Sequence, residues 1–342
     1  MGGGRSRDGA VGYGEGCPRD YVTGETLAGA AAFAARHERD WRASIHDLAS
    51  LRDWTTRHCR DIDSNPATWA AVELALLELM AQEQDIPVER LLGLAPVEGQ
   101  FRYTAVLGDA SAPVFAAQLA RYQQAGLRDF KLKLSGDFAR DLAKVRALKD
   151  AGVAPERVRA DANNLWHGAD TARLHLDGLC YRFCAVEEPL RAGDLAGMRE
   201  LARAWGGRLI LDESLLRAEQ LQKLCADPGR WVVNLRVSKL GGLLRALEVL
   251  GGARALGIPV VVGAHVGESS LLTRAALPLA QAGAGSLLGQ EGAFGTHLLV
   301  EEVCTAPLMF GAGGRLAVDG LAAKPGWGLA INAPPQHLQP LH

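Results

Sequence analysis

The chain has no long hydrophobic run, no block of basic residues and no Cys-x-x-Cys pair. Its longest apolar stretches, such as Ile258–Val262, are too short to span a bilayer. A net charge of −2 without a Lys/Arg run argues against a nucleic-acid-binding surface. No basic segment followed by an apolar one opens the chain, so we expect a cytoplasmic protein with no membrane partner.

The six cysteines lack the Cys-x-x-Cys spacing of metal sites, and in a reducing cytosol we interpret them as buried free thiols. The hydrophobic fraction of 48% and the charged fraction of 22% are typical of globular proteins. A length of 342 residues accommodates a barrel of about 250 residues and a smaller domain.

Titratable side chains recur along the chain at nearly one spacing. They are Lys133, Asp161, Glu187, Asp212, Lys239, His265 and Glu291. Successive members are 25 to 28 residues apart, and a strand with its crossover helix needs roughly 25–30 residues. Thr104, in the strand-like run Arg102–Leu107, extends the series to eight positions. Eight βα units predict a (β/α)8-type barrel, whose active site lies at the C-terminal ends of the strands.

The regular spacing divides the chain into three parts. Residues 1–98 are rich in helix signals, including Asp63-Ser64-Asn65-Pro66 before an apolar helical run. Residues 99–305 carry the βα rhythm, with the sixth strand expected over Trp231–Lys239. Residues 306–342 form a tail rich in Gly and Pro. We expect an α/β protein in which the N-terminal part and the returning tail form an α+β capping domain on the barrel.

Three of the recurring residues are carboxylates on consecutive predicted strands, namely Asp161, Glu187 and Asp212. Without a cation they would repel one another strongly in a partly buried site. Mg²⁺ prefers oxygen ligands and would remove this repulsion. The sequence therefore predicts one Mg²⁺ ion at these residues, with Mn²⁺ as the alternative.

Lysines accompany the carboxylates on two strands. Lys131 and Lys133 are two residues apart, so both should face the barrel interior, where adjacent ammonium groups lower a lysine pKa towards that of a general base. Lys239, at the end of the sixth strand, should lie across the barrel from Lys133. Arg236 precedes Lys239 by three residues and should face the opposite way, towards a carboxylate on a barrel helix.

The end of the predicted seventh strand carries His265 and Glu268. These two residues either contact a substrate or form a hydrogen bond at the rim. We place both among the substrate-binding candidates, together with Asn163 and Glu291.

Taken in order, the motifs resemble those of the enolase superfamily, and within it the muconate-lactonizing-enzyme and mandelate-racemase-like proteins. The motifs are Gly12-Tyr13-Gly14-Glu15, Leu91-Leu92-Gly93, Lys131-Leu132-Lys133, Asp161-Ala162-Asn163, Val186-Glu187-Glu188-Pro189-Leu190, Leu211-Asp212-Glu213-Ser214 and Ser238-Lys239-Leu240-Gly241-Gly242. The resemblance implies that Lys133 or Lys239 removes the proton α to a substrate carboxylate. It also implies a metal-stabilised enediolate with Lys131 as an auxiliary cation, and it selects Glu187 rather than Glu188 as the metal ligand.

Two features depart from the family pattern. The family has strands before the Gly-Tyr-Gly-Glu segment, so we expect the N-terminal strands to be truncated or part of the lid to be absent. Dipeptide epimerases of the subgroup have Asp-x-Asp on the eighth strand to hold a substrate ammonium, whereas this chain has Gly289-Gln290-Glu291.

Three functions remain open. The first is racemisation or epimerisation of an amino-acid derivative or dipeptide-like acid, an isomerase activity. The second is a lyase reaction at the same site, by a cycloisomerase, a succinylbenzoate-synthase-like enzyme or an acid-sugar dehydratase. The third is a non-catalytic binding protein that lost its lid. For the enzymes we expect a small-molecule carboxylate as substrate, no nucleic-acid partner, and a symmetric homo-oligomer.

Overall fold

The computed structural model describes residues 2–5, 10–332 and 339–341. Eight parallel strands form one sheet in chain order. They are β4 (Ala105–Leu107), β5 (Phe130–Lys133), β6 (Val158–Asp161), β7 (Ala185–Glu187), β8 (Leu209–Leu211), β9 (Trp231–Leu235), β10 (Val260–Val262) and β11 (Leu287–Gln290). The backbone N–H of Thr104, just before β4, donates to the Gln290 carbonyl in β11 at 2.8 Å, which joins the two edges. The expected (β/α)8-type fold is confirmed.

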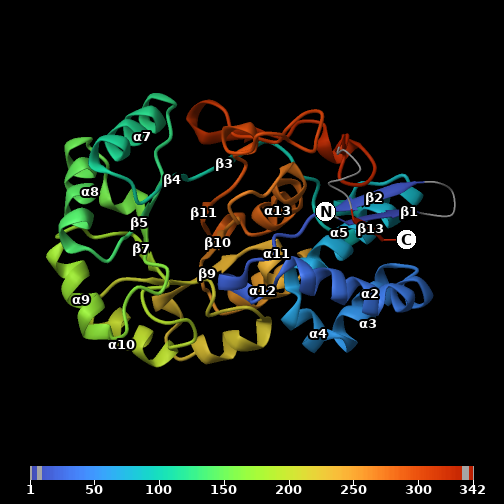
Figure 1. The fold of residues 1–342 in the computed structure, drawn as a ribbon, viewed down its shortest axis with the longest axis horizontal. Coiled ribbons are helices and arrows are strands. Elements are labelled where there is room, and N and C mark those ends of the chain that lie inside the picture. The colour runs from blue at the N-terminus through green and yellow to red at the C-terminus, as the bar shows by residue number, and fades with distance from the viewer. Residues whose placement is uncertain (1, 6–9, 333–338, 342) are drawn as a thin grey trace.

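Helices follow most strands and lie outside the sheet (Figure 1). They are α7 (Ala112–Gln124), α8 (Phe138–Asp150), α9 (Ala169–Gly178), α10 (Leu195–Trp205), α12 (Leu243–Ala255) and α13 (Ser270–Ala282). Side chains of Asp137 and Asp194 accept hydrogen bonds from backbone N–H groups in the first turns of α8 and α10, which fixes where these helices begin. Between β8 and β9 the connection consists of the 3₁₀ segments η2 (Ala218–Leu224) and η3 (Pro228–Arg230).

Alternation along the strands separates two apolar regions. Side chains that point into the barrel form a small buried cluster of Ala185, Ile210, Val232 and Val261, against which Leu288 packs. Their strand neighbours, such as Val186, Leu211 and Val262, belong to the large core between the sheet and its helices. Because alternate residues share a face, the inward-facing position two residues after each cluster member lies nearer the C-terminal rim. The site residues Glu187 and Asp212 occupy two such positions.

The N-terminal part forms a helical capping region beside the barrel (Figure 1). Its helices are α1 (Asp20–Thr23), α2 (Leu27–Ser44), α3 (Leu48–Arg57), α4 (Cys59–Ser64), α5 (Pro66–Glu83) and α6 (Val88–Leu92). Pro66 opens α5, as expected for a residue whose missing N–H costs nothing in the first turn. The long helix α5 is buried along most of its length.

Strand β2 (Val11–Gly14) lies directly on α5 because it presents glycine at alternate positions. A Cβ atom at Gly12, Gly14 or Gly16 would stand within 2.2 Å of a carbonyl oxygen of the helix. The Gly-x-Gly-x-Gly spacing is therefore a packing requirement, since any side chain would push the strand away from α5.

The C-terminal tail contributes to the same region. Strand β13 (Gln339–Leu341) pairs with β1 (Gly2–Arg5), and β1 pairs with β2. The indole N–H of the fully buried Trp327 donates to the Leu74 carbonyl of α5 at 3.1 Å. Nearer the barrel, β12 (Arg315–Ala317) pairs with β3 (Gln100–Arg102). The expected capping range 1–98 begins at Met1, and the expected tail 306–342 ends at His342. Both of these residues lie outside the described residues.

The capping region also supports the segment that carries Lys239. This residue lies in the short helix α11 (Val237–Leu240), which contacts α5. The backbone N–H of Cys17 donates to Ser238 Oγ at 2.8 Å, and Leu244 N donates to Glu73 Oε1 at 3.1 Å. The position of Lys239 therefore depends on both parts of the molecule.

Three details differ from the sequence-based expectations. Strand β9 ends at Leu235, so the expected strand over Trp231–Lys239 is wrong in its last part. The run Arg102–Leu107 is interrupted, and Thr104 precedes β4 instead of ending it. The cysteines are all free, but Cys59, Cys180 and Cys225 are exposed, not buried. Among the described helices, none combines the length and the apolar character needed to cross a membrane.

Glu73 generates a test of how the capping region responds to pH. Burial raises its pKa from 4.5 to about 7. Between pH 4.5 and pH 7 the folded protein keeps a proton on Glu73 that the unfolded chain releases. The contribution of this proton to the unfolding free energy is therefore complete below about pH 4.5 and is lost as pH rises through 7. For Glu73→Gln we expect the fall in unfolding free energy from pH 6 to pH 8 to shrink by about 1 kcal/mol. Urea unfolding of both proteins at pH 6 and pH 8 measures this difference. If the variant loses as much unfolding free energy between the two pH values as the parent, Glu73 does not have a raised pKa.

Candidate functional site

The register of the barrel strands brings the predicted residues to one rim. Lys133 of β5 is the register partner of Asp161 of β6, which in turn is the partner of Glu187 of β7. Asp212 follows the last residue of β8. The three carboxylates are 1% exposed, so their charges depend on neighbouring groups and not on water.

The ammonium group of Lys131 lies at the centre of this cluster. Its Nζ atom is 2.9 Å from Asp161 Oδ2, 2.8 Å from Glu187 Oε2 and 3.2 Å from Glu291 Oε2. The lysine is itself buried. One buried cation therefore contacts carboxylates from three different strand ends.

Lys133 shares the inward face with Lys131 and lies closer to solvent. Its Nζ is 2.6 Å from Asp161 Oδ2 and donates to Asn163 Oδ1 at 2.7 Å. Its side chain is 31% exposed, against 3% for Lys131. Of the two, Lys133 has the access to solvent that a small molecule would need.

Lys239 approaches the cluster from the side opposite Lys133. It follows β9, which is four strands away from β5 in the sheet order. Its Nζ is 3.0 Å from Asp212 Oδ1. The same atom donates to the carbonyls of Asp212 at 2.7 Å, Asn234 at 2.8 Å and Leu215 at 3.2 Å. Its side chain is fully buried, and these acceptors hold the ammonium group in place.

Arg236 faces the site, which corrects the expectation that it would face a barrel helix. Its guanidinium forms an ion pair with Asp212 and lies 3.6 Å from Glu187 Oε1. The physical reason is that β9 ends at Leu235 and α11 begins at Val237, so the alternation of a strand does not extend from Lys239 back to Arg236. Asn234, the inward residue before it, donates to Glu187 Oε1 at 2.9 Å.

Cations bridge the predicted metal ligands, since Lys131 contacts Asp161 and Glu187 and Arg236 contacts Glu187 and Asp212. Among the described residues, Asp161, Glu187 and Asp212 do not form a set of ligand atoms within 4.8 Å of one another. Glu187 Oε2 and both carboxylate oxygens of Asp212 are held by ion pairs with Lys131, Arg236 and Lys239, and by no further hydrogen-bond donor in the described part of the chain. Buried carboxylate oxygens whose only partners are cations are suitable ligands for a hard cation that replaces those partners. The donor set fits Mg²⁺ provided that Lys131 and Arg236 give up contacts to it.

The charges shift the carboxylates in different directions. Burial, reinforced by neighbouring carboxylates and opposed by Lys131, raises the pKa of Glu187 to about 7. Burial acts the same way on Asp212, but Arg236 and Lys239 outweigh it and hold the pKa of Asp212 below its ordinary value. In this arrangement the ionised form of Asp212 is favoured, whereas burial favours the protonated form of Glu187.

The pKa of Lys131 contradicts one sequence-based expectation. Burial acts to lower this pKa, but the surrounding carboxylates outweigh burial and raise the pKa above its ordinary value. We expected a lowered pKa because Lys133 is close to Lys131 in the sequence. The three carboxylates that contact Lys131 in the folded protein have the opposite and larger effect. Lys131 is a permanent cation in this arrangement.

The other candidates occupy different parts of the rim. Glu291 points into the cluster, where Oε1 is 3.0 Å from the Arg159 guanidinium. The backbone N–H of His265 donates to Glu268 Oε1 at 2.7 Å, and the ring Nδ1 lies 3.2 Å from the same oxygen. His265 Nε2 is buried and has no partner among the described residues. His265 and Glu268 form a pair of their own, with a ring nitrogen left for another contact.

Sequence reasoning assigned no role to Glu188, which organises the segment after β8. Its carboxylate accepts from Asp212 N at 2.7 Å and from Ser214 N and Oγ at 2.8 Å each. Its backbone adopts φ of 38°, so its side chain does not continue the strand alternation. Burial, with nearby Glu213 acting in the same direction, raises the pKa of Glu188 to about 8. The repeated acid in Val186-Glu187-Glu188 was the available sequence signal.

Comparisons with known proteins agree with this geometry. Residues 114–334 match the family described as enolase C-terminal domain-like. The chain is 30% identical over 336 residues to the L-Lys-D/L-Arg epimerase of Methylococcus capsulatus, covering 95% of this chain and 89% of that protein. It is 25% identical over 344 residues to the N-succinyl-L-Arg/Lys racemase of Bacillus cereus, covering 95% and 85%. The structure of the Enterococcus faecalis dipeptide epimerase with Mg and L-Leu-L-Tyr matches at a TM-score of 0.79 and 25% identity, over 95% of this chain and 90% of that one.

The two lysines of β5 provide a matched pair for testing the buried charge network. We expect Lys131→Met to lower the free energy of unfolding by about 3–5 kcal/mol without divalent cations, because buried carboxylates lose their shared partner. Lys133→Met should cost no more than about 1 kcal/mol, because that ammonium group is partly solvated. Chemical denaturation of both variants measures the difference. Equal losses would show that Lys131 does not carry the charge balance.

Proposed function

The chain belongs to the enolase superfamily, and from that membership we propose that it catalyses Mg²⁺-dependent removal of the proton α to a carboxylate. We further propose racemisation or epimerisation of an amino-acid derivative or dipeptide-like acid as the outcome. The epimerase and racemase activities of similar proteins support the reaction class.

One observation carries the proposal, which is the placement of two lysines on either side of the carboxylate cluster. Lys133 contacts Asp161 at one end, and Lys239 contacts Asp212 at the other. Lys133 ends β5, and Lys239 follows β9, which is four strands from β5 in the eight-stranded sheet. Such an arrangement allows one amine to take the α-proton from one face of a carbon while the other ammonium group delivers a proton to the opposite face.

We assign the metal to Asp161, Glu187 and Asp212. The oxygens of Glu187 and Asp212 that are held only by ion pairs support this assignment, as does Mg in the similar dipeptide epimerase structure. When bound, Mg²⁺ would supply positive charge where negative charge develops on the substrate carboxylate. Lys131 and Arg236 are the cations that now occupy the neighbourhood of these oxygens, and we propose that they remain close as auxiliary positive charges.

The remaining residues set the position of the substrate in this proposal. Asn163 holds the Lys133 ammonium group through its side-chain oxygen. His265, with its free Nε2, is placed to donate or accept a hydrogen bond, and Glu268 fixes its ring. We propose these contacts as the means of orienting the substrate, because a misoriented α-carbon would not present its proton to either lysine.

The surroundings of Glu291 bear on the class of substrate. Lys131 and Arg159 already pair with both of its oxygens. A free substrate ammonium would have to compete with these two buried cations. We therefore place N-acylated amino acids, whose amide nitrogen carries no charge, ahead of free dipeptides.

A lyase reaction at the same site is the second candidate, and the environment of Lys239 favours it. Three backbone carbonyls and Asp212 hold its ammonium group. A lysine held in this way suits a fixed cation better than a base that must lose its proton. In that case Lys133 alone would move protons.

The metal assignment is tested by thermal unfolding with and without Mg²⁺. We expect Mg²⁺ to raise the Tm of the wild-type protein, because a ligand that binds the folded state stabilises it. Asp212→Asn should abolish this rise. Asp129→Asn, which removes a carboxylate from a partly exposed ion pair with Arg157, should retain it. If Mg²⁺ stabilises the Asp212 variant as much as the parent, the ligand set is wrong.

Hydrogen exchange in D₂O separates the two reactions. With N-acylated amino acids and dipeptides as the panel, we expect each stereoisomer of a substrate to exchange its α-proton through a different lysine. Lys133→Ala should lose exchange with one isomer and Lys239→Ala with the other. Each variant should lose interconversion by about 10²–10⁴-fold or more.

The decisive observation concerns the Lys239 variant. If Lys239→Ala still exchanges both isomers at parental rates, the two-base mechanism fails. Lys239 would then act as a fixed cation, and products of elimination or cyclisation should be sought.

A further inference from the structure

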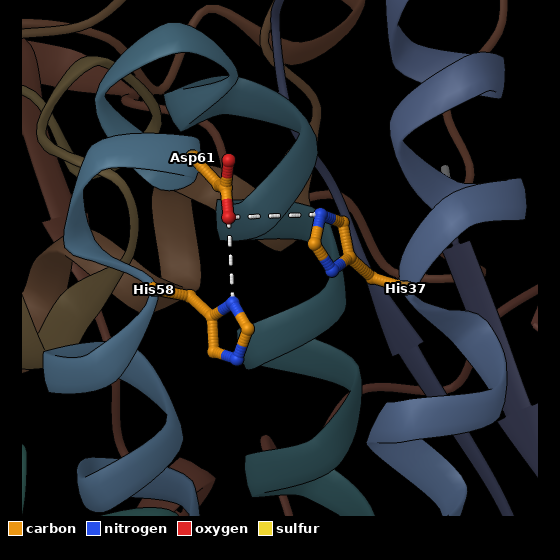
Figure 2. Close-up of side chains that lie close together, drawn as sticks. All are labelled: His37, His58 and Asp61. Atoms are coloured by element: carbon orange, nitrogen blue, oxygen red, sulfur yellow. Dashed lines mark hydrogen bonds and ion pairs between the residues drawn. The ribbon is translucent and has the colours of Figure 1, made fainter.

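A second set of metal-type ligands lies in the capping region, on residues that the proposed reaction does not use. His37 comes from α2, His58 from the junction of α3 and α4, and Asp61 from the first turn of α4. Figure 2 shows the two imidazole rings directed at one carboxylate oxygen from different helices. Two segments more than twenty residues apart are thereby brought to one point.

The distances are close to those that one ion would need. Asp61 Oδ2 is 3.9 Å from His37 Nε2 and 3.4 Å from His58 Nδ1. One ligand atom from each residue lies within 4.8 Å of the other two. Donors bound at about 2.0–2.2 Å from a tetrahedral ion stand roughly 3.4 Å apart, so side-chain adjustments of an ångström or less complete the site.

The environment of His37 leaves one ring nitrogen available to a ligand. The residue is 8% exposed, and its Nε2 atom is buried with no hydrogen-bond partner among the described residues. Phe33, Trp41 and Trp54 pack against the ring, which limits its access to water. A buried polar nitrogen without a partner is unfavourable, and an ion at this position would provide that partner.

His58 has the arrangement of a metal ligand with a supporting carboxylate. Its Nδ1 faces Asp61, and its Nε2 lies 3.6 Å from Asp40 Oδ2. The indole N–H of Trp54 fixes that carboxylate, and the ring of His58 stacks on Trp54 with centroids 4.1 Å apart. A carboxylate behind one ring nitrogen holds the proton there and leaves the other nitrogen free to bind a metal.

We propose that His37, His58 and Asp61 bind a divalent transition-metal ion of the Zn²⁺ type, with water completing its coordination. Two imidazoles and one carboxylate favour such an ion over Mg²⁺, which prefers oxygen ligands. The Asp61 side chain is 45% exposed and provides an entry path from solvent. The ion would tie α2 to α4.

The position of the site indicates what such an ion would stabilise. Asp63, two residues after Asp61 on α4, forms ion pairs with Arg217 and Arg245 of the barrel. A metal that anchors α4 to α2 would therefore brace the contact between the capping region and the barrel. We expect its effect to appear in stability and not in the chemistry at the barrel rim.

The test measures Zn²⁺ binding to tag-free protein by competition with a chromophoric chelator, together with the Tm. We expect the wild-type chain to bind one ion in the capping region and to melt at a higher temperature with it. Because His37 is part of a packed aromatic cluster, Asp61→Asn and His58→Gln are the primary variants. Each should weaken binding by about 100-fold or more, beyond the roughly 10–100-fold typical of outer-shell substitutions such as Asp40→Asn.

Two controls separate this site from other sources of binding. His46→Gln changes a histidine of the same region whose ring contacts the Ala43 carbonyl, and it should bind Zn²⁺ like the parent. Asp212→Asn alters the barrel carboxylates and should also retain the Asp61-dependent ion. The proposal is overturned if the parent protein shows no Zn²⁺ binding that Asp61→Asn weakens, or if Asp212→Asn alone removes the bound ion.

Discussion

The neutralisation of buried carboxylates at the barrel rim is the constraint on which this structure depends. Parallel strands in register place Asp161 beside Glu187, and the end of β8 adds Asp212. Such charges cannot be buried together without cations. The protein supplies Lys131 at the centre, Arg236 at the Asp212 side and lysines at both ends. The cations that balance these carboxylates are also the groups that we propose to move or stabilise charge during the reaction.

The capping region takes part in this constraint because Lys239 does not belong to a strand. It lies on α11, whose position is set by contacts to α5 and to the segment after β2. That segment can reach the barrel because glycines at alternate positions let β2 lie directly on α5. The N-terminal motif and the sixth barrel unit are therefore parts of one mechanical arrangement, although they are more than 200 residues apart.

Much of the barrel could be predicted because its period is a property of the sequence. The spacing of Lys133, Asp161 and Glu187 follows directly from strand and helix lengths, and the structure places these residues at three strand ends. The direction of Arg236 could not be predicted, because a helical turn replaces the strand one residue later. The role of Glu188 was equally hidden, since it depends on a left-handed backbone conformation that the sequence pattern does not reveal.

Electrostatic quantities were the least predictable. The expectation for Lys131 depended on one neighbour known from sequence, whereas its pKa depends on carboxylates contributed by three other strands. The ring of His37 shows the same limit, because its burial arises from aromatic residues on two helices, α2 and α3. The burial of a side chain and the charge around it depend on residues from distant parts of the chain. The spacing of residues in the sequence does not reveal these neighbours.

The most direct test of the central claim is anomalous diffraction from crystals soaked in Mn²⁺, which binds oxygen-rich sites as Mg²⁺ does. The account predicts an anomalous peak bonded to Asp161, Glu187 and Asp212, with Lys131 and Arg236 withdrawn from the oxygens that they now contact. The contradicting result is the absence of an anomalous peak at this position, with Lys131 still among the carboxylates, at Mn²⁺ concentrations that stabilise the protein. The cluster would then be a structural ion network and not a metal centre.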